Sequence, residues 1–345
     1  MNNSTLGAKF IPLSGIEIVN KIYIIRKYPG PEIDKVEYIV LPGICRLTIF
    51  YLLISPFILA WHTRKKQVSL ILGYHIIPHA FFAWIASILT GVPYAIGQTG
   101  LYIQRYTNQI FIRGIVHNLI KKSLFLNVPG QYSKDFWIKK GVLPEKINLL
   151  HSTVDTSRFY NQNLDKKYDL IFIGRFSPEK NIDLLINGFY LAVKEMPELT
   201  FALVGDGFLQ NKLYELVKKL GLEEHVLFIG KQDNVEQYLN QSRIFIMASA
   251  SEGLPLALME AMACELLVLS TCIGNISDIL KHKETGLVIN HSEPSIIAEA
   301  IMESIKIYDN TVKIRKFARQ QIVSYHSHEY ARKMWRPLLN NPLLN

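Results

Sequence analysis

The chain is poor in cysteine and shows no sign of a secretory signal. Its 345 residues include three cysteines, Cys45, Cys264 and Cys272, which are too few and too scattered for a disulfide framework or a zinc site. This usage is typical of a reducing compartment, so we expect a cytoplasmic protein. The first ten residues, MNNSTLGAKF, lack the charged start and long apolar core of a secretory signal.

A long run of basic residues is also missing, although the net charge is +9. A nucleic acid, a phosphate-bearing ligand or an anionic membrane surface would each suit such a charge. The basic residues stand in clusters of two or three, and no zinc-finger or RNP motif accompanies them. We therefore predict that the protein binds no nucleic acid.

The second half of the chain alternates short apolar runs with helical patterns about six times between residues 168 and 307. Such alternation predicts an α/β fold, with a parallel sheet covered by helices on both faces and ligands at the carboxyl ends of its strands. The first half predicts a second α/β domain, with strands over 21–27, 35–42, 67–74, 92–98 and 123–129 and a helix over 79–91.

The length favours two domains, and the polar segment 152–169 is the expected linker. We expect an N-terminal domain over 1–155 and a C-terminal domain over 165–325. A C-terminal helix over 326–345 would either end there or return to the N-terminal domain.

An uncharged apolar run, LTIFYLLISPFILAW, covers residues 47–61 and is followed by Arg64, Lys65 and Lys66. A spanning helix needs about 20 residues, so the length of this run favours a helix buried in the core. The alternative is an interfacial helix that attaches the protein peripherally to the cytoplasmic membrane face.

The segment GRFSPEKN, 174–181, directly follows a predicted strand and opens a helix. Gly174 allows a sharp turn, and Arg175 and Lys180 place two cations where a doubly wound fold holds its ligand. Two cations beside helix N-termini suit a pyrophosphate, although a loop with solvated charges fits this motif equally well. The turn VGDG follows the next strand, and its Gly205 and Gly207 allow close backbone approach.

The segment SEGLPLALMEAMACE places Glu252 and Glu260 eight positions apart. Pro255 suits the first position of a helix, so the amides around Gly253 and Leu254 are expected to form an anion site. Carboxylates accept hydrogen bonds from paired sugar hydroxyls, so one glutamate could hold a ribose and the other a hexose. Alternatively, Glu252 caps the helix and Glu260 is solvated, but a solvated helix face would carry more than one charge.

In this order and at these spacings, GRFSPEKN, VGDG, the FIG at 228–230 and SEGLPLALMEAMACE resemble the nucleotide-sugar-binding half of family 4 glycosyltransferases of the GT-B type. The two glutamates match the E-x7-E motif of that family, and the resemblance covers about residues 150–325. It implies two Rossmann-like doubly wound domains facing across a cleft, retention of anomeric configuration, and a nucleotide-diphosphate sugar as co-substrate. It also implies no obligatory cofactor or metal, in agreement with the absence of an Asp-x-Asp pair from the sequence.

The resemblance also assigns roles to residues. Arg175 and Lys180 would hold the diphosphate, Glu260 the ribose, and Glu252 the transferred sugar. The catalytic residues would be Glu252, Lys180 and Arg175. The remaining donor-binding residues would be Gly174, Gly205, Gly207, Gly253, Leu254, Pro255 and Glu260.

The N-terminal half departs from the family pattern. The first strand and Gly-rich loop of relatives are missing before Lys21, so this unit is either absent or replaced. The segment GQTG, 97–100, places Thr99 where relatives often carry a histidine. We take His75, Gln98 and Thr99 as acceptor-side candidates together with His79, although a histidine near an apolar helix is more often structural.

The resulting hypothesis is a retaining hexosyltransferase of polysaccharide or glycolipid biosynthesis, acting on a glycan or lipid-linked acceptor. One alternative is an inactive relative that binds a nucleotide sugar or glycan without transfer. Another is a GT-B-type sugar-nucleotide epimerase. A dinucleotide dehydrogenase is disfavoured, because no G-x-G-x-x-G follows a strand.

Overall fold

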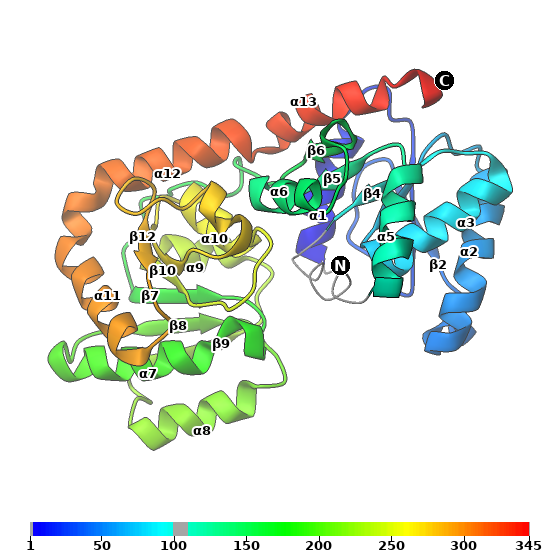
Figure 1. Ribbon diagram of the computed structural model, residues 1–345. Coiled ribbons are helices and arrows are strands. Elements are labelled where there is room, and N and C mark those ends of the chain that lie inside the picture. The colour runs from blue at the N-terminus through cyan, green and yellow to red at the C-terminus, as the bar shows by residue number, and fades with distance from the viewer. Residues whose placement is uncertain (1–2, 99–109, 345) are drawn as a thin grey trace. The chain divides into compact units, whose positions relative to one another are not determined.

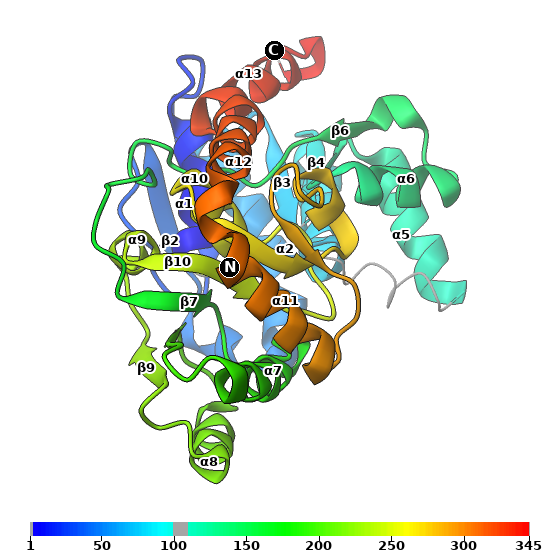
Figure 2. The same cartoon turned by 90° about the vertical axis from the view of Figure 1, so that its left-hand side faces the viewer.

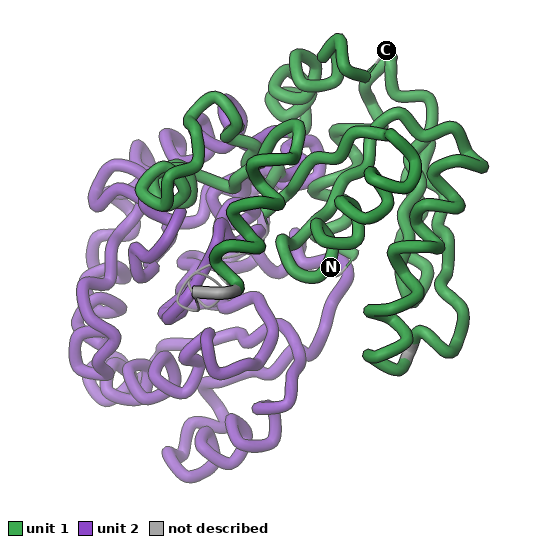
Figure 3. Tube along the Cα trace, turned by 45° about the vertical axis from the view of Figure 1, so that its right-hand side comes forward, with its two compact units in different colours: residues 1–153, 328–345 green, residues 154–327 purple. Residues whose placement is uncertain are grey.

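The computed structural model describes residues 3–98 and 110–344, which divide into two compact units (Figures 1 and 3). The N-terminal unit comprises residues 1–153 and 328–345, and the C-terminal unit comprises residues 154–327. Every strand pairing among the described residues is parallel. Each unit therefore has the α/β construction that the alternation of elements predicts.

The C-terminal unit is built on one six-stranded sheet, in the order β9-β8-β7-β10-β11-β12. Its inner strands are short apolar runs that are buried on both faces, as parallel strands between helices must be, whereas the edge strand β9 is only partly buried. They are β7 (Tyr168–Ile173), β8 (Phe201–Val204), β9 (Val226–Gly230), β10 (Ser242–Met247), β11 (Leu267–Thr271) and β12 (Leu287–Ile289). Its helices are α7 (Ile182–Glu195), α8 (Gln210–Leu220), α9 (Val235–Asn240), α10 (Leu256–Ala263), α11 (Pro294–Ile307) and α12 (Val312–Tyr325).

The helices of this unit pack in pairs. Helix α7 packs against α11, as Figure 2 shows, and α10 packs against α12. The first pair can approach closely because Gly188 has no side chain: a Cβ there would lie 2.5 Å from Cγ2 of Ile297.

The strand order places a switch point in the middle of the sheet. The chain begins at β7, moves outward through β8 to β9, and then returns to β10 on the other side of β7. The helices that follow β7 and β10 therefore lie on opposite faces of the sheet, and the loops before these helices meet at its carboxyl edge. A doubly wound sheet binds its ligand at this point, beyond the carboxyl ends of the two strands.

The N-terminal unit contains a four-stranded sheet, β3-β4-β5-β6, and a separate pair, β1-β2. The strands are β1 (Ile22–Arg26), β2 (Val36–Val40), β3 (Ile71–Tyr74), β4 (Tyr94–Gly97), β5 (Leu126–Val128) and β6 (Ile147–Leu149). The helices are α1 (Asn3–Ser14), α2 (Thr48–Lys65), α3 (Phe81–Thr90), α5 (Ile110–Lys122), α6 (Gln131–Lys139) and α13 (His328–Leu339), and α13 packs on α1. The residues before Lys21 thus include a helix where relatives often carry a strand.

The apolar run 47–61 lies in α2, and only one side of this helix is buried. Ser55, Pro56, Ala60 and Thr63 are buried, whereas large apolar side chains on the other side are exposed. The interpretation of the run as a core helix is therefore wrong for the outer face, because no described element covers it. No helix in the described part of the chain combines the length and the apolar character needed to cross a bilayer.

Candidate donor site in the C-terminal unit

Two loops meet at the switch point of the C-terminal sheet. One follows β7 and carries the segment 174–181, and the other follows β10 and carries the segment 249–255. The amide of Ala250 donates to the carbonyl of Glu179 at 2.8 Å, and Nδ2 of Asn181 donates to the carbonyl of Ala248 at 2.9 Å. These hydrogen bonds hold the two sequence motifs side by side.

The structure pairs two of the candidate catalytic residues directly. Nζ of Lys180 donates to Oε1 of Glu252 in an ion pair between the two loops. The side chains are only 19% and 12% exposed, so solvent screens this pair less than it screens a surface pair. The cation and the carboxylate therefore fix each other's position at the carboxyl end of the sheet.

Arg175 lies near Lys180 in sequence, but its side chain is exposed rather than held in an ion pair of this kind. It follows the turn at Gly174, is exposed, and its guanidinium makes no hydrogen bond with any residue that the structure describes. A guanidinium in this state can bind an anionic ligand without first breaking an internal contact.

Gly205 and Gly207 shape the site through packing. A Cβ on Gly205 would lie 1.9 Å from the carbonyl oxygen of Gly174, and one on Gly207 would lie 2.4 Å from that of Phe176. Gly205 also has a φ of +142°, which residues with side chains rarely adopt. The two glycines thus let the loop after β8 lie directly against the loop after β7.

Glu260 occupies a different electrostatic environment from Glu252. It lies within α10, and burial raises the pKa of its carboxyl to about 7, while Arg158 lowers that pKa and Glu236 raises it. Its carboxylate makes no hydrogen bond or ion pair with any described residue. Lys180 therefore contacts Glu252 and not Glu260.

Arg158 and Glu236 belong to the environment of Glu260, although no sequence motif pointed to them. Nη2 of Arg158 lies 2.7 Å from Oε2 of Glu236 and 2.7 Å from the carbonyl oxygen of Asp233. Arg158 lies in the predicted linker, 152–169, whose polar composition gave no sign of a partner 78 positions away.

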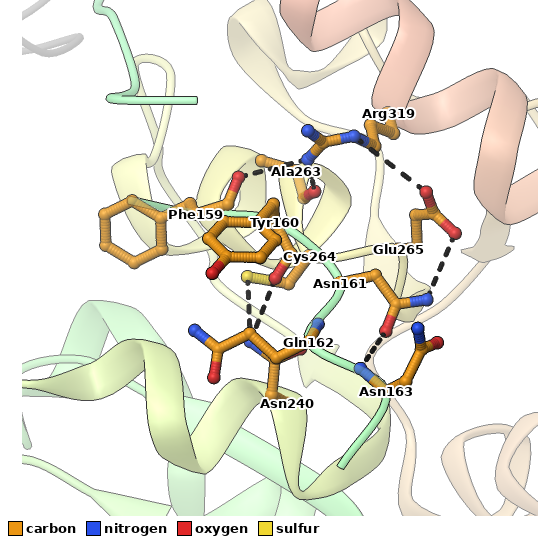
Figure 4. A network of polar contacts seen from close by, with 10 residues as sticks. All are labelled: Phe159, Tyr160, Asn161, Gln162, Asn163, Asn240, Ala263, Cys264, Glu265 and Arg319. Atoms are coloured by element: carbon orange, nitrogen blue, oxygen red, sulfur yellow. Dashed lines mark hydrogen bonds and ion pairs between the residues drawn. The ribbon is translucent and has the colours of Figure 1, made fainter. Parts of the chain in front are cut away.

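A polar network anchors the C-terminal end of α10, the helix that carries Glu260 (Figure 4). Nη1 of Arg319 donates to the carbonyl oxygens of Phe159, at 3.1 Å, and Ala263. Nδ2 of Asn240 donates to the carbonyl of Tyr160 at 3.1 Å, so the chain entering this unit is tied to α9, α10 and α12.

Replacing Arg319 with Ala is expected to lower the free energy of unfolding by about 1–3 kcal/mol, because charge-assisted bonds to two carbonyls are lost. Denaturant titration measures the change. Lys316→Ala, at an exposed position on the same helix, serves as the control and should stay within about 0.5 kcal/mol of the parent. Equal unfolding midpoints for the two variants would show that this network does not stabilise the unit.

The acceptor-side candidates lie in the N-terminal unit. Gln98 is buried, and its Nε2 donates to Oγ of Ser133 at 3.0 Å while its Oε1 accepts from Nε1 of Trp137 at 2.8 Å. Its side chain therefore joins the sheet to α6. His79 pairs through Nε2 with the hydroxyl of Tyr51 at 2.8 Å. Thr99 lies outside the described residues.

His75 follows β3, and burial lowers its pKa to about 4, so its imidazole is neutral at physiological pH. Lys9 of α1, which the sequence analysis missed, is also buried, and its pKa falls to about 8. Its Nζ lies 6.0 Å from the ring centroid of Tyr74, the residue before His75. A lysine in an apolar helix gives no sequence signal that distinguishes burial from exposure.

Two parallel-sheet units, with a ligand site at the switch point of the second, define the GT-B class of fold. The crystal structure of Anabaena Alr3699/HepE in complex with UDP and glucose matches with a TM-score of 0.80 at 18% identity, covering 99% of this chain and 98% of that one. Residues 154–321 match the family described as glycosyl transferases group 1. The C-terminal unit matches this glycosyltransferase family, so the expected family resemblance and the expected fold class are confirmed.

Two relatives extend the match beyond the C-terminal unit. The N-acetyl-alpha-D-glucosaminyl L-malate synthase of Bacillus anthracis is 26% identical over 259 residues, which cover 70% of this chain and 67% of that protein. The N-acetylgalactosamine-N,N'-diacetylbacillosaminyl-diphospho-undecaprenol 4-alpha-N-acetylgalactosaminyltransferase of Campylobacter jejuni is 26% identical over 192 residues, which cover 52% of each. The chain spans about half the length, or less, of most of the curated relatives that it matches.

Proposed function

We propose that the protein is a retaining glycosyltransferase of family 4 that moves a hexose from a nucleotide-diphosphate sugar to an acceptor. The observation that carries the proposal is the ion pair of Lys180 with Glu252 at the switch point, near the exposed guanidinium of Arg175, which has no hydrogen-bond partner among the described residues. A uridine diphosphate sugar is the donor that we favour, since Alr3699/HepE was crystallised with UDP and glucose.

In this proposal the residues stabilise the charge that develops on the leaving diphosphate. Arg175 binds it bidentately, Lys180 binds it as a point charge, and the amides that open α10 add their dipoles. Groups already in position when the charge develops lower the barrier more than groups that must move. Glu252 holds Lys180 and contacts the transferred sugar, and Glu260 accepts hydrogen bonds from the ribose hydroxyls.

No carboxylate is placed as an obvious nucleophile, so we propose that the acceptor attacks from the face of the leaving group. The acceptor is a glycan or a lipid-linked glycan, as the name of the Campylobacter jejuni relative describes for that enzyme. We place the reaction at the cytoplasmic face of a membrane, in polysaccharide or glycolipid biosynthesis, where an acceptor of this kind is presented.

Activity is expected to survive EDTA, because Arg175, Lys180 and the helix amides supply the positive charge that a metal would otherwise provide. Among the described residues, no three His, Cys, Asp or Glu side chains gather as a metal site would require. Initial rates with and without chelator test this. A loss of activity that Mg²⁺ or Mn²⁺ restores would contradict it.

Product analysis tests the function and separates the alternatives. The protein is incubated with uridine diphosphate glucose and uridine diphosphate N-acetylglucosamine, with and without glycan and lipid-diphosphate acceptors. Release of UDP that depends on acceptor, with an α-linked product, supports the proposal. Interconversion of sugar nucleotides without acceptor would identify an epimerase, and donor binding without turnover would identify an inactive relative.

A further inference from the structure

Helix α2 carries a row of exposed apolar side chains, which we call the α2 stripe. It consists of Ile49, Leu53, Phe57 and Trp61, which are 64%, 61%, 60% and 56% exposed. Residues at every fourth position lie one above another on the same side of a helix. The four side chains therefore form one continuous apolar face rather than isolated exposed residues.

Neighbouring residues widen this surface. Leu52 on α2 is 45% exposed, and Ile88 and Leu89 at the end of α3 are 64% and 41% exposed. Helices α2 and α3 pack together within the N-terminal unit (Figure 1), and Nη2 of Arg64 donates to the carbonyl of Leu89. The ends of the two helices thus present apolar side chains and a guanidinium together.

The segment of the sequence that carries the α2 stripe has charges of one sign, and Glu37, directly before this segment, pairs with Lys66 at 2.9 Å. Residues 38–134 contain nine Lys and Arg and no Asp or Glu, while the other 29 Lys and Arg are matched by 29 Asp and Glu elsewhere. The whole net charge of +9 thus comes from the segment that contains α2 and α3. Close to the stripe, Nζ of Lys65 lies 4.5 Å from the ring centroid of Trp61.

We propose that the α2 stripe docks the protein on an anionic lipid bilayer, with α2 lying in the plane of the interface. The apolar side chains would enter the boundary between headgroups and acyl chains, while Arg64 and Lys65 reach the headgroup phosphates. Tryptophan stacked with lysine suits this boundary, because one end of the pair is apolar and the other is charged. A second copy of the chain fits less well, because docking stripe to stripe would bring like charges together.

Vesicle sedimentation tests the proposal, with phosphatidylcholine vesicles and with vesicles that also contain phosphatidylglycerol. No nucleotide sugar is present, so failure here is distinct from failure of the proposed transfer reaction. We expect binding to the anionic vesicles that weakens as salt rises. Phe57→Gln and Leu53→Gln should each lower the partition coefficient by roughly tenfold, because each removes a large apolar side chain that the bilayer would bury. Lys65→Gln should lower it by roughly fivefold on the anionic vesicles alone.

Leu143→Gln is the matched control, because Leu143 is 57% exposed in the same unit but lies outside the α2 stripe. It should bind vesicles like the parent, and thermal melts should show all variants folded. If Phe57→Gln and Leu143→Gln bind equally well, or if the parent does not bind, the proposal is wrong.

Fluorescence provides a second readout. Of the four tryptophans, Trp137 and Trp335 are 2% exposed, Trp84 of α3 is partly buried, and Trp61 is 56% exposed. Anionic vesicles should shift the emission to the blue, brominated lipid should quench it, and Trp61→Phe should remove most of both effects, leaving at most the contribution of Trp84. Sedimentation velocity without lipid should show a monomer. A dimer that Phe57→Gln dissociates would assign the stripe to self-association and overturn the proposal.

Discussion

Lys180→Ala is expected to lower kcat by a factor of roughly 10²–10³, because a preorganised charge on the leaving group is lost from the transition state. KM for the donor should change less, because the charge on the leaving diphosphate grows mainly in the transition state. Steady-state kinetics with a saturating acceptor measure both constants. Lys194→Ala, in the last turn of α7, removes a lysine far along that helix from the switch point and should leave kcat unchanged.

The ion pair with Glu252 makes this result more informative. Glu252→Gln should lower kcat by itself, and the double variant should be little worse than Lys180→Ala, because the two side chains position each other. Losses that simply multiply would mean that the two residues act independently. Full activity in all three variants would refute the assignment of this loop pair as the donor site.

Glu260→Gln is expected to weaken donor binding by roughly tenfold or more at pH 8, where the loss of charge-assisted hydrogen bonds to ribose is complete. Because the pKa of Glu260 is raised to about 7, the parent carboxyl is largely protonated at pH 6 and ionised at pH 8. Donor affinity of the parent should therefore rise between these pH values, and that of the variant should not. Isothermal titration with UDP at both pH values tests this.

Glu260→Gln should weaken donor binding but increase the stability of the ligand-free protein. A carboxyl whose pKa is raised by folding destabilises the folded state when it is ionised. This loss of stability is absent at pH values below the pKa in the unfolded chain, and it is complete above the folded value of about 7. Glu260→Gln should therefore stabilise the ligand-free protein by on the order of 1–3 kcal/mol at pH 8 and by little near pH 4.5. A variant less stable than the parent at pH 8 would show that the Glu260 carboxylate is well compensated in the ligand-free state.

The sequence predicted the C-terminal sheet well because its strands form short apolar runs, most of them buried on both faces. It also placed Arg175, Lys180 and Glu252 at carboxyl ends of strands. It did not predict the contact between Lys180 and Glu252, because these residues are 72 positions apart and meet only since β10 lies beside β7. Periodicity identifies strands but does not order them in a sheet.

The N-terminal half was harder to predict for a different reason. Helix α2 is apolar around most of its circumference, so periodicity could not reveal which side is exposed. Gln98 was proposed for the acceptor on the basis of its place in GQTG, but its amide is bonded to Ser133 and Trp137, which are remote in sequence. The raised pKa of Glu260 likewise depends on burial and on side chains from the linker and α9.

The discontinuity of the N-terminal unit bears on how the chain folds during synthesis. Residues 154–327 form a unit from one uninterrupted stretch, so that unit can fold as soon as it leaves the ribosome. The N-terminal unit must wait for α13, whose Trp335 is 2% exposed and packs near Phe125 at a ring-centroid distance of 6.3 Å. The half of the protein that is translated first is therefore completed last, and a nascent chain halted before residue 328 would leave the cavity for Trp335 unfilled.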